Sequence, residues 1–185
     1  MKQSKTLSTY VALLRGINVG GKNRLPMPDL AQMFVEAGCA DVRTYIQSGN
    51  VIFKASEAHA GKLPVLIPRR ISEDYGYKIP VVTRTAGQLQ DTIQNNPFLK
   101  AGTPEATLHV YFLASLPDPS SIAALDPDRS PPDRFCVRER DVYVQLPNGM
   151  ARTKLTNAYF DSKLATISTA RNWRTVLTLF ELMQG

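Results

Sequence analysis

The same order of predicted elements occurs twice along the chain. In each half a strand is followed by a helix, a hairpin of two short strands and a further helix. The hairpin segments VRTYIQSGNVIF and FCVRERDVYVQL lie roughly a hundred residues apart. Residue identities differ between the halves, so the repeat is one of pattern. It predicts two copies of one compact unit.

In the first half, apolar periodicity and turn residues locate the elements. Pro64 and Pro68 interrupt an apolar segment, so only the second part of that segment is predicted to be a regular helix. The predicted elements are a strand over 9–17, a helix over 27–37 ended by Gly38, strands on either side of Ser48–Asn50, a helix within 62–75, a strand over 79–85, and a helix capped by Thr85 and stopped by Asn96 and Pro97.

The second half repeats this order with a Pro-rich turn after its first strand. Its polar hairpin turn falls near Glu139–Asp141. The predicted elements are a strand over 107–114, a short helix over 122–125, the hairpin, a helix over 154–164 with Thr153 as N-cap, and a closing helix over 172–183.

These elements predict an α+β fold of two ferredoxin-like βαββαβ subdomains, apparently duplicated, with a C-terminal helix. The subdomains are expected at residues 1–97 and 98–185, joined near Pro97–Pro104. The strands YVALLRGI and LHVYFL are apolar on both faces, which predicts that both faces are covered. The cover could be the other sheet, a helix or a second copy of the chain.

Composition limits the classes of function. The chain has 185 residues and a formal net charge of +6, which favours anionic partners. It has no apolar segment long enough to span a membrane, which predicts a cytoplasmic protein without a membrane partner. Cys39 and Cys136 are far apart and lie outside any Cys/His cluster, so we expect free buried thiols, no metal and no cofactor.

The segment YVALLRGINVGGKNRLP, residues 10–26, breaks from a strand into a loop of glycines and cations. Gly16–Lys22 fits the phosphate-binding pattern GxxxxGK. However, Asn23 replaces the magnesium-binding hydroxyl, and Pro26 and Pro28 forbid a helix starting at Lys22. A P-loop NTPase is therefore rejected. What remains is a loop whose backbone amides and cations could hold an anion, or a tight connection whose cations face water.

Two predicted helix starts carry cations where the helix dipole favours acidic residues. Arg152 and Lys154 lie at the start of the 154–164 helix, and Arg171 and Arg174 lie at the start of the last helix. An anion held by the amides and cations together would compensate for this charge. Alternatively, the long side chains extend into water.

Groups for acid–base or nucleophilic catalysis are sparse. His59 and His109 lie outside any catalytic motif, and the acidic residues are dispersed. Ser48 has no evident histidine partner and is predicted to shape a turn. Trp173 belongs to an apolar helical stripe, which favours core packing over base stacking. No catalytic residue is identified.

The segments LRGINVGGKNRLPM, VRTYIQSGNV, LPNGMARTKLTN and TARNWRTV resemble domain-of-unknown-function family 1697 of bacteria over nearly the whole chain. The resemblance implies two ferredoxin-like subdomains and no established activity, ligand or cofactor. Pro64 and Pro68 fall where the family has a regular helix. The motif positions are Arg15, Gly16, Asn18, Gly20, Gly21, Lys22, Ser48, Gly49, Asn50, Lys154, Asn157, Arg171, Asn172 and Trp173.

The leading functional hypothesis is a binder of a phosphate-bearing or other anionic ligand, either nucleotide-like or nucleic acid, in one cleft. An enzyme acting on a small anionic substrate is the alternative, and an interaction module, including a homodimer, is a third. The chain lacks the aromatic signature of RNA-recognition modules, which disfavours specific RNA stacking. The predicted ligand-binding residues are Arg15, Asn18, Gly20, Gly21, Lys22, Ser48, Asn50, Lys154, Asn157, Arg171 and Asn172.

Overall fold

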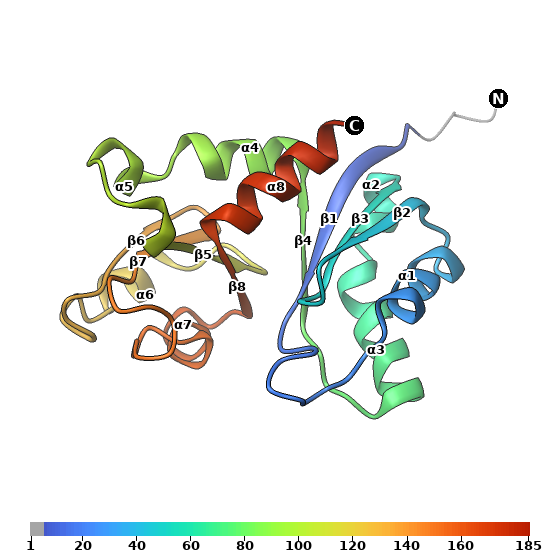
Figure 1. Ribbon diagram of the computed structural model, residues 1–185, viewed down its shortest axis with the longest axis horizontal. Helices are drawn as coiled ribbons and strands as arrows, with labels where there is room; N and C mark the ends of the chain where they lie inside the picture. The colour runs from blue at the N-terminus through green and yellow to red at the C-terminus, as the bar shows by residue number, and fades with distance from the viewer. Residues whose placement is uncertain (1–5) are drawn as a thin grey trace. The chain divides into compact units, whose positions relative to one another are not determined.

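A computed structural model describes residues 6–185 and divides the chain into two compact units (Figure 1). The first unit contains the chain up to Leu89 together with Leu179–Gly185, and the second contains Gln90–Thr178. Relative to the predicted ranges 1–97 and 98–185, residues 90–97 belong to the second unit and residues 179–185 to the first.

The first unit contains a four-stranded antiparallel sheet with strand order β2-β3-β1-β4. Its helices follow β1 and β3, as in a βαββαβ unit. The elements are β1 Ser8–Leu14, α1 Met27–Glu36, β2 Ala40–Tyr45, β3 Asn50–Ala55, α2 Glu57–Ala60, α3 Leu63–Tyr75, β4 Val81–Thr85 and the start of α4 Ala86–Gln94.

The second unit repeats this topology, with strand order β6-β7-β5-β8. Its elements are α5 Pro97–Lys100, the 3-10 turn Glu105–Thr107, β5 Leu108–Leu113, α6 Pro119–Ala123, β6 Arg134–Arg138, β7 Asp141–Gln145, α7 Asn157–Leu164, β8 Ser168–Asn172 and most of α8 Trp173–Gln184. The predicted α+β fold of two βαββαβ subdomains with a C-terminal helix is therefore confirmed. The sequence pattern implied β8 but did not locate it.

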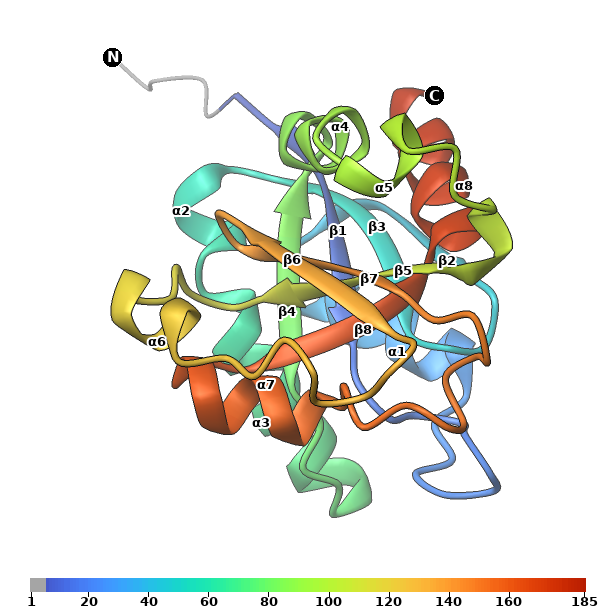
Figure 2. The ribbon, with the colours of Figure 1, turned by 90° about the vertical axis from the view of Figure 1, so that its left-hand side faces the viewer.

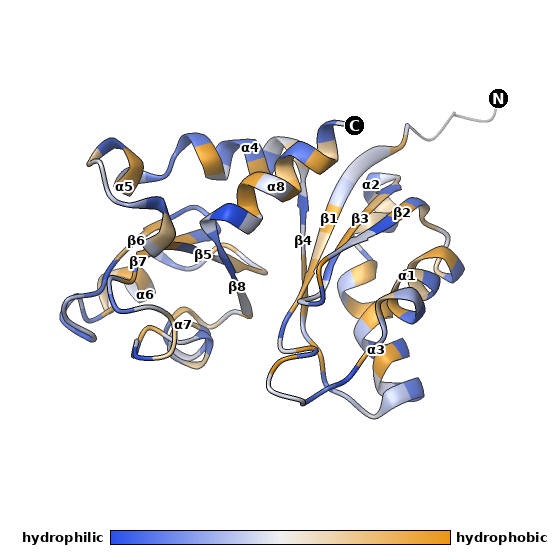
Figure 3. Cartoon of the chain, viewed as in Figure 1, coloured by the Kyte–Doolittle hydropathy of each residue, from blue (hydrophilic) through white to orange (hydrophobic). Residues whose placement is uncertain are grey.

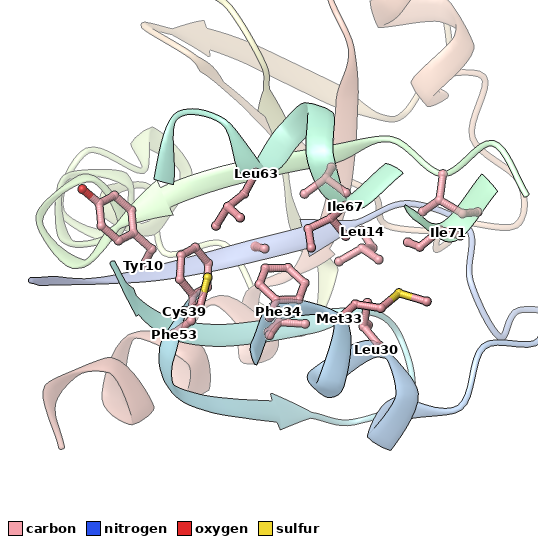
Figure 4. Packing of buried hydrophobic residues seen from close by; sticks show 14 of the residues in the cluster. Tyr10, Leu14, Leu30, Met33, Phe34, Cys39, Phe53, Leu63, Ile67 and Ile71 are labelled. Atoms are coloured by element: carbon pink, nitrogen blue, oxygen red, sulfur yellow. The ribbon is translucent and has the colours of Figure 1, made fainter. Parts of the chain in front are cut away.

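The core of the first unit lies between its sheet and α1 and α3 (Figure 4). Alternate residues of β1 point into this core, where Tyr10 stacks on Phe53 with ring centroids 5.6 Å apart. From α1, Leu30, Met33 and Phe34 meet them on one apolar stripe of the helix. In Figure 3 the second half of β1 and most of β3 carry hydrophobic colours.

The opposite face of each sheet is also buried. Val11, Leu13 and Ile52 are at most 2% exposed in the first unit. Val110 and Phe112 are fully buried in the second. The prediction that both faces of these strands are covered is confirmed.

The core of the second unit gathers on the side of the sheet where α6 and α7 lie (Figure 2). Phe160 of α7 is fully buried and meets the ring of Tyr111 edge-on, with centroids 5.0 Å apart. The Tyr111 hydroxyl donates to the carbonyl oxygen of Leu155, which ties the segment before α7 to β5. Burial is the main reason that the pKa of Tyr111 is raised.

Two predicted helices differ from the structure. The helix α3 runs unbroken through Pro68, whereas only its second part was expected to be regular. Leu63, Ile67 and Ile71 share its buried face, so core packing outweighs the hydrogen bond that Pro68 cannot make.

The helix α7 begins three residues later than predicted. Its N-cap is Thr156, whose hydroxyl accepts a hydrogen bond from the backbone N–H of Tyr159 at 3.2 Å, and not Thr153. The Thr153 hydroxyl instead accepts from the N–H of Leu155 at 3.0 Å. Arg152 and Lys154 therefore precede this helix, and they do not load its first turn with positive charge.

The duplication extends to individual residues at the ends of β4 and β8. Arg84 pairs with Val11 of β1, and Arg171 pairs with Val110 of β5. Both arginines are buried, and each Nη1 donates to the carbonyl oxygen of the preceding residue, at 3.0 Å for Arg84 and 2.7 Å for Arg171. The next residue caps the following helix in both units. The Thr85 hydroxyl accepts from the N–H of Gln88, and Oδ1 of Asn172 accepts from the N–H of Thr175.

Candidate functional site

The glycine-rich loop after β1 forms a short hairpin that projects beyond the end of the strand (Figure 1). Val19 and Lys22 form an antiparallel bridge, with the N–H of Lys22 donating to the carbonyl oxygen of Val19 at 3.0 Å. Gly20 and Gly21 occupy the turn with φ of 57° and 75°, as a two-residue type I′ turn requires. We call residues 16–25 the basic hairpin.

Two asparagines fasten the base of the basic hairpin. The side-chain amide of Asn18 donates to the carbonyl oxygens of Leu25 at 2.9 Å and Gln47 at 3.0 Å, and its Oδ1 accepts from the N–H of Leu25. Asn23 Nδ2 donates to the carbonyl oxygen of Gly16 at 2.9 Å. Since Leu25 is buried, the hairpin is anchored on the core. Asn18 was predicted to bind the ligand. In the structure its side chain instead bonds the backbone of Leu25 and Gln47.

The geometry agrees with the rejection of a P-loop. A P-loop lysine opens a helix, but Lys22 lies in the hairpin and Asn23 follows with φ of 48°. The helix α1 begins only at Met27, with proline in its first turn.

Three segments meet at this end of the first sheet: residues 15–28, 46–50 and 76–80. Pairing of β1 with β3 and β4 brings them together, and the N–H of Arg15 donates to the carbonyl oxygen of Pro80 at 3.1 Å. They carry the cations Arg15, Lys22, Arg24 and Lys78, and none of their residues is Asp or Glu. We call this surface the basic end.

Lys22, Arg24 and Lys78 of the basic end are exposed. Within residues 6–185, none of these three cations forms an ion pair. Arg24 and Lys78 are not among the predicted ligand-binding residues. Lys78 lies far along the chain from the glycine-rich loop, and only the antiparallel pairing of β1 with β4 brings it there.

The turn between β2 and β3, which contributes residues 46–50 to the basic end, is held by hydrogen bonds of its own residues. Asn50 is fully buried, and its Nδ2 donates to the carbonyl oxygen of Tyr45 at 3.1 Å and to the Ser48 hydroxyl at 3.0 Å. The predicted ligand residues Ser48 and Asn50 thus bond each other inside the turn. Ile46 has φ of 49°, which is strained for a β-branched residue, and its side chain is 49% exposed.

In the second unit, Lys154 and Asn157 lie on either side of the N-cap Thr156. The backbone N–H of Lys154 donates to the Ser130 hydroxyl at 2.9 Å, and the residue is exposed. Asn157 Nδ2 donates to the hydroxyl of Ser168 at 2.9 Å, and that hydroxyl donates to Asp161 at 2.6 Å. This chain of bonds joins α7 to the start of β8.

Arg171 was predicted at the start of the last helix. The structure instead places it in β8. Its Nη1 also donates to the Thr169 hydroxyl at 3.0 Å, and burial lowers the pKa of its guanidinium to about 10. Asn172 caps α8, and Arg174 lies in its first turn as predicted. The predicted meeting of these residues with the basic end in one cleft stays a prediction.

A cavity of about 460 Å³ lies in the second unit at the start of α8, lined in part by His109, Trp173 and Arg174. Nε1 of Trp173 and Nδ1 of His109 are buried and have no hydrogen-bond partner among residues 6–185. Since solvent does not reach these two atoms, the cavity does not present them to a ligand. Trp173 is 1% exposed, which confirms its predicted place in the core.

Residues 6–185 lack two further features. No three His, Cys, Asp or Glu side chains gather as a metal site would require. No helix there combines the length and the apolar character needed to cross a membrane.

Comparisons with known proteins give a family and a fold. No curated protein matches the chain. A solved structure titled as the conserved bacterial protein SP0830 from Streptococcus pneumoniae is similar, with a TM-score of 0.73 at 20% identity. The match covers 96% of this chain and 99% of that one, and at this identity it shows a shared fold. The model of the family described as "Protein of unknown function (DUF1697)" matches residues 7–143.

Proposed function

The chain belongs to the DUF1697 family of proteins of unknown function, and we propose that it binds a phosphate-bearing anion at the basic end of its first unit. The observation that carries this proposal is the charge of that surface. Three segments distant in sequence supply four cations and no carboxylate. By contrast, Lys54 of the first unit is paired with Asp41 at 2.6 Å, and Arg70 is paired with Glu36 and Asp74.

Unpaired cations at one sheet end create a positive potential that falls off over about 8 Å at physiological ionic strength. Lys22, Arg24 and Lys78 pay no cost of breaking an ion pair when an anion arrives. A phosphate carries charge and several acceptor oxygens, so it matches lysine and arginine donors together.

The basic hairpin adds backbone donors to this surface. Gly20 and Gly21 are exposed, and nothing lies within 4 Å of the position that a Cβ would take at either residue. An anion can therefore approach their N–H groups directly. The bonds of Asn18 and Asn23 hold the hairpin before a ligand arrives, which reduces the conformational entropy lost on binding. Lys154, Arg171 and Asn172 stay predicted contributors.

The proposal is tested by isothermal titration with pyrophosphate and a nucleoside triphosphate, using wild type and the variant Lys22→Gln with Lys78→Gln. We expect wild type to bind and the double variant to lose at least tenfold in affinity, because it lacks two cations. The matched control is Lys100→Gln with Lys163→Gln, which removes two exposed lysines of the second unit.

The control should retain wild-type affinity, and melting curves should show that all three proteins fold. Equal affinity of both double variants would show that the basic end is not the site. Absence of any heat with either anion, together with absence of binding to a nucleic acid duplex, would overturn the proposal.

A further inference from the structure

The shape of the basic end selects among phosphate-bearing ligands. Sites for small molecules are concave and enclose most of the ligand. The basic hairpin instead projects from the unit (Figures 1 and 2). The two cavities described within the first unit, of about 310 and 300 Å³, are lined by residues outside the basic end. A projecting element fits a ligand that has a groove of its own.

We propose that the basic hairpin enters the major groove of B-form DNA, an inference that rests on the proposed function. That groove is about 12 Å wide and admits a two-stranded ribbon. The hairpin is such a ribbon, and its turn has no side chains because Gly20 and Gly21 form it. The tip is therefore as narrow as the backbone allows.

The side chains around the tip match the chemistry of that groove. Val19 is 62% exposed and pairs across the hairpin with Lys22, and Arg24 follows two residues later on the returning limb. An exposed valine at the end of a projecting ribbon can contact the methyl group of thymine, which lies in the major groove. The cations then face the phosphates on the two sides of the groove.

Arg15 and Lys78 lie at the base of the hairpin, together with the exposed Ile46 in its strained turn. With Lys22 and Arg24 they make at most four phosphate contacts. The logarithm of the affinity should therefore fall with the logarithm of the salt concentration with a slope of about −3 to −4.

Duplex RNA provides a sharp comparison, because the major groove of its A-form helix is too deep and narrow for side chains to enter. Fluorescence anisotropy would compare a labelled DNA duplex, the RNA duplex of the same sequence and a DNA duplex with uracil in place of thymine. Vesicles of phosphatidylcholine and phosphatidylglycerol test the alternative that the exposed apolar tip and the cations meet an anionic membrane.

We expect wild type to bind the DNA duplex at least tenfold more tightly than the RNA duplex, and to bind the uracil duplex more weakly than the thymine duplex. Val19→Asp should lose at least tenfold in DNA affinity, because it replaces the apolar contact with thymine by a carboxylate inside a groove bordered by phosphates. The matched control is Val65→Asp, since Val65 is 70% exposed on α3, outside the basic end. It should bind DNA like wild type.

Equal binding of DNA and RNA duplexes with no effect of Val19→Asp would overturn the inference. So would binding to the vesicles without binding to the duplex. In both cases the proposed function stands if pyrophosphate binding still depends on Lys22 and Lys78. If no phosphate-bearing ligand binds at all, the proposed function fails as well.

Discussion

Gly49 of the QSGN segment shows what a motif residue can do without touching a ligand. Its φ is 80°, and a Cβ there would lie 2.8 Å from Cβ of Leu14 and 3.0 Å from Cδ1 of Ile17. Its carbonyl oxygen also accepts from the N–H of Leu14 at 2.8 Å. Only glycine fits this approach between the turn and the end of β1.

We predict that Gly49→Ala destabilises the protein by at least about 2 kcal/mol more than Gly102→Ala, because overpacking adds to the backbone strain. Gly102 has a similar φ of 69° with open space at its Cβ position, so it isolates the strain alone. Urea unfolding of both variants measures the difference. Equal losses of stability would contradict the close approach.

A second prediction for a single residue concerns His109. Burial is the larger influence on its ring and lowers the pKa, while a backbone hydrogen bond at Thr107 opposes the shift. The unfolded chain therefore takes up a proton at a higher pH than the folded one. The stability that neutral His109 contributes is present above pH 6.5 and is lost as the pH falls below it.

His109→Gln removes this titration and leaves His59 in place. Urea titrations at pH 7 and pH 5 measure the unfolding free energy of both proteins. On going from pH 7 to pH 5, wild type should lose more unfolding free energy than the variant. A difference that does not change with pH over this interval would show that His109 does not contribute it.

At the scale of elements, apolar patterns and turn residues predicted the strands β1, β3, β5 and β7, both hairpins and the cap at Thr85. These features depend on neighbouring residues, which is why a single sequence reveals them. The start of α7 was misplaced because Thr153 and Thr156 both resemble N-caps. The bonds of Leu155 with Tyr111 and of Lys154 with Ser130 hold the earlier segment out of the helix.

The helix α3 contains two prolines whose effects should differ. Pro64 lies in the first turn, where no N–H is required, whereas Pro68 lies inside the helix. We predict that Pro68→Ala stabilises the protein by about 1–2 kcal/mol and that Pro64→Ala changes it by less than about 0.5 kcal/mol. Thermal unfolding checks both. A destabilised Pro68→Ala variant would show that packing of the ring outweighs the missing bond.

At the scale of the molecule, two βαββαβ units share one plan, but the basic end belongs to the first unit. In the second unit, the connection that follows β5 is Ala114–Asp118, and it carries no cation. The corresponding connection of the first unit is the basic hairpin. A specialised loop on a repeated scaffold is a common way for a fold to acquire a site.

The sequence could predict the loop as a candidate site, because glycines and cations stand together there. It could not predict Lys78, whose segment 76–80 comes next to Arg15 through the pairing of β1 with β4. Nor could it separate Asn18 and Asn50, which bond the protein itself, from Lys22 and Arg24, which face solvent. For Asn18, that distinction depends on a contact with Gln47, which is 29 residues further along the chain.

The most direct test of anion binding at the basic end is a ¹⁵N NMR titration of the full chain with pyrophosphate. We expect amide shifts that saturate with ligand and are largest in residues 15–24, with smaller shifts in 46–50 and 76–80. These shifts should be lost in the variant with both Lys22→Gln and Lys78→Gln, because that variant lacks two cations of the basic end. Saturating shifts confined to the second unit, or shifts that the double variant retains, would show that the anion does not bind at the basic end.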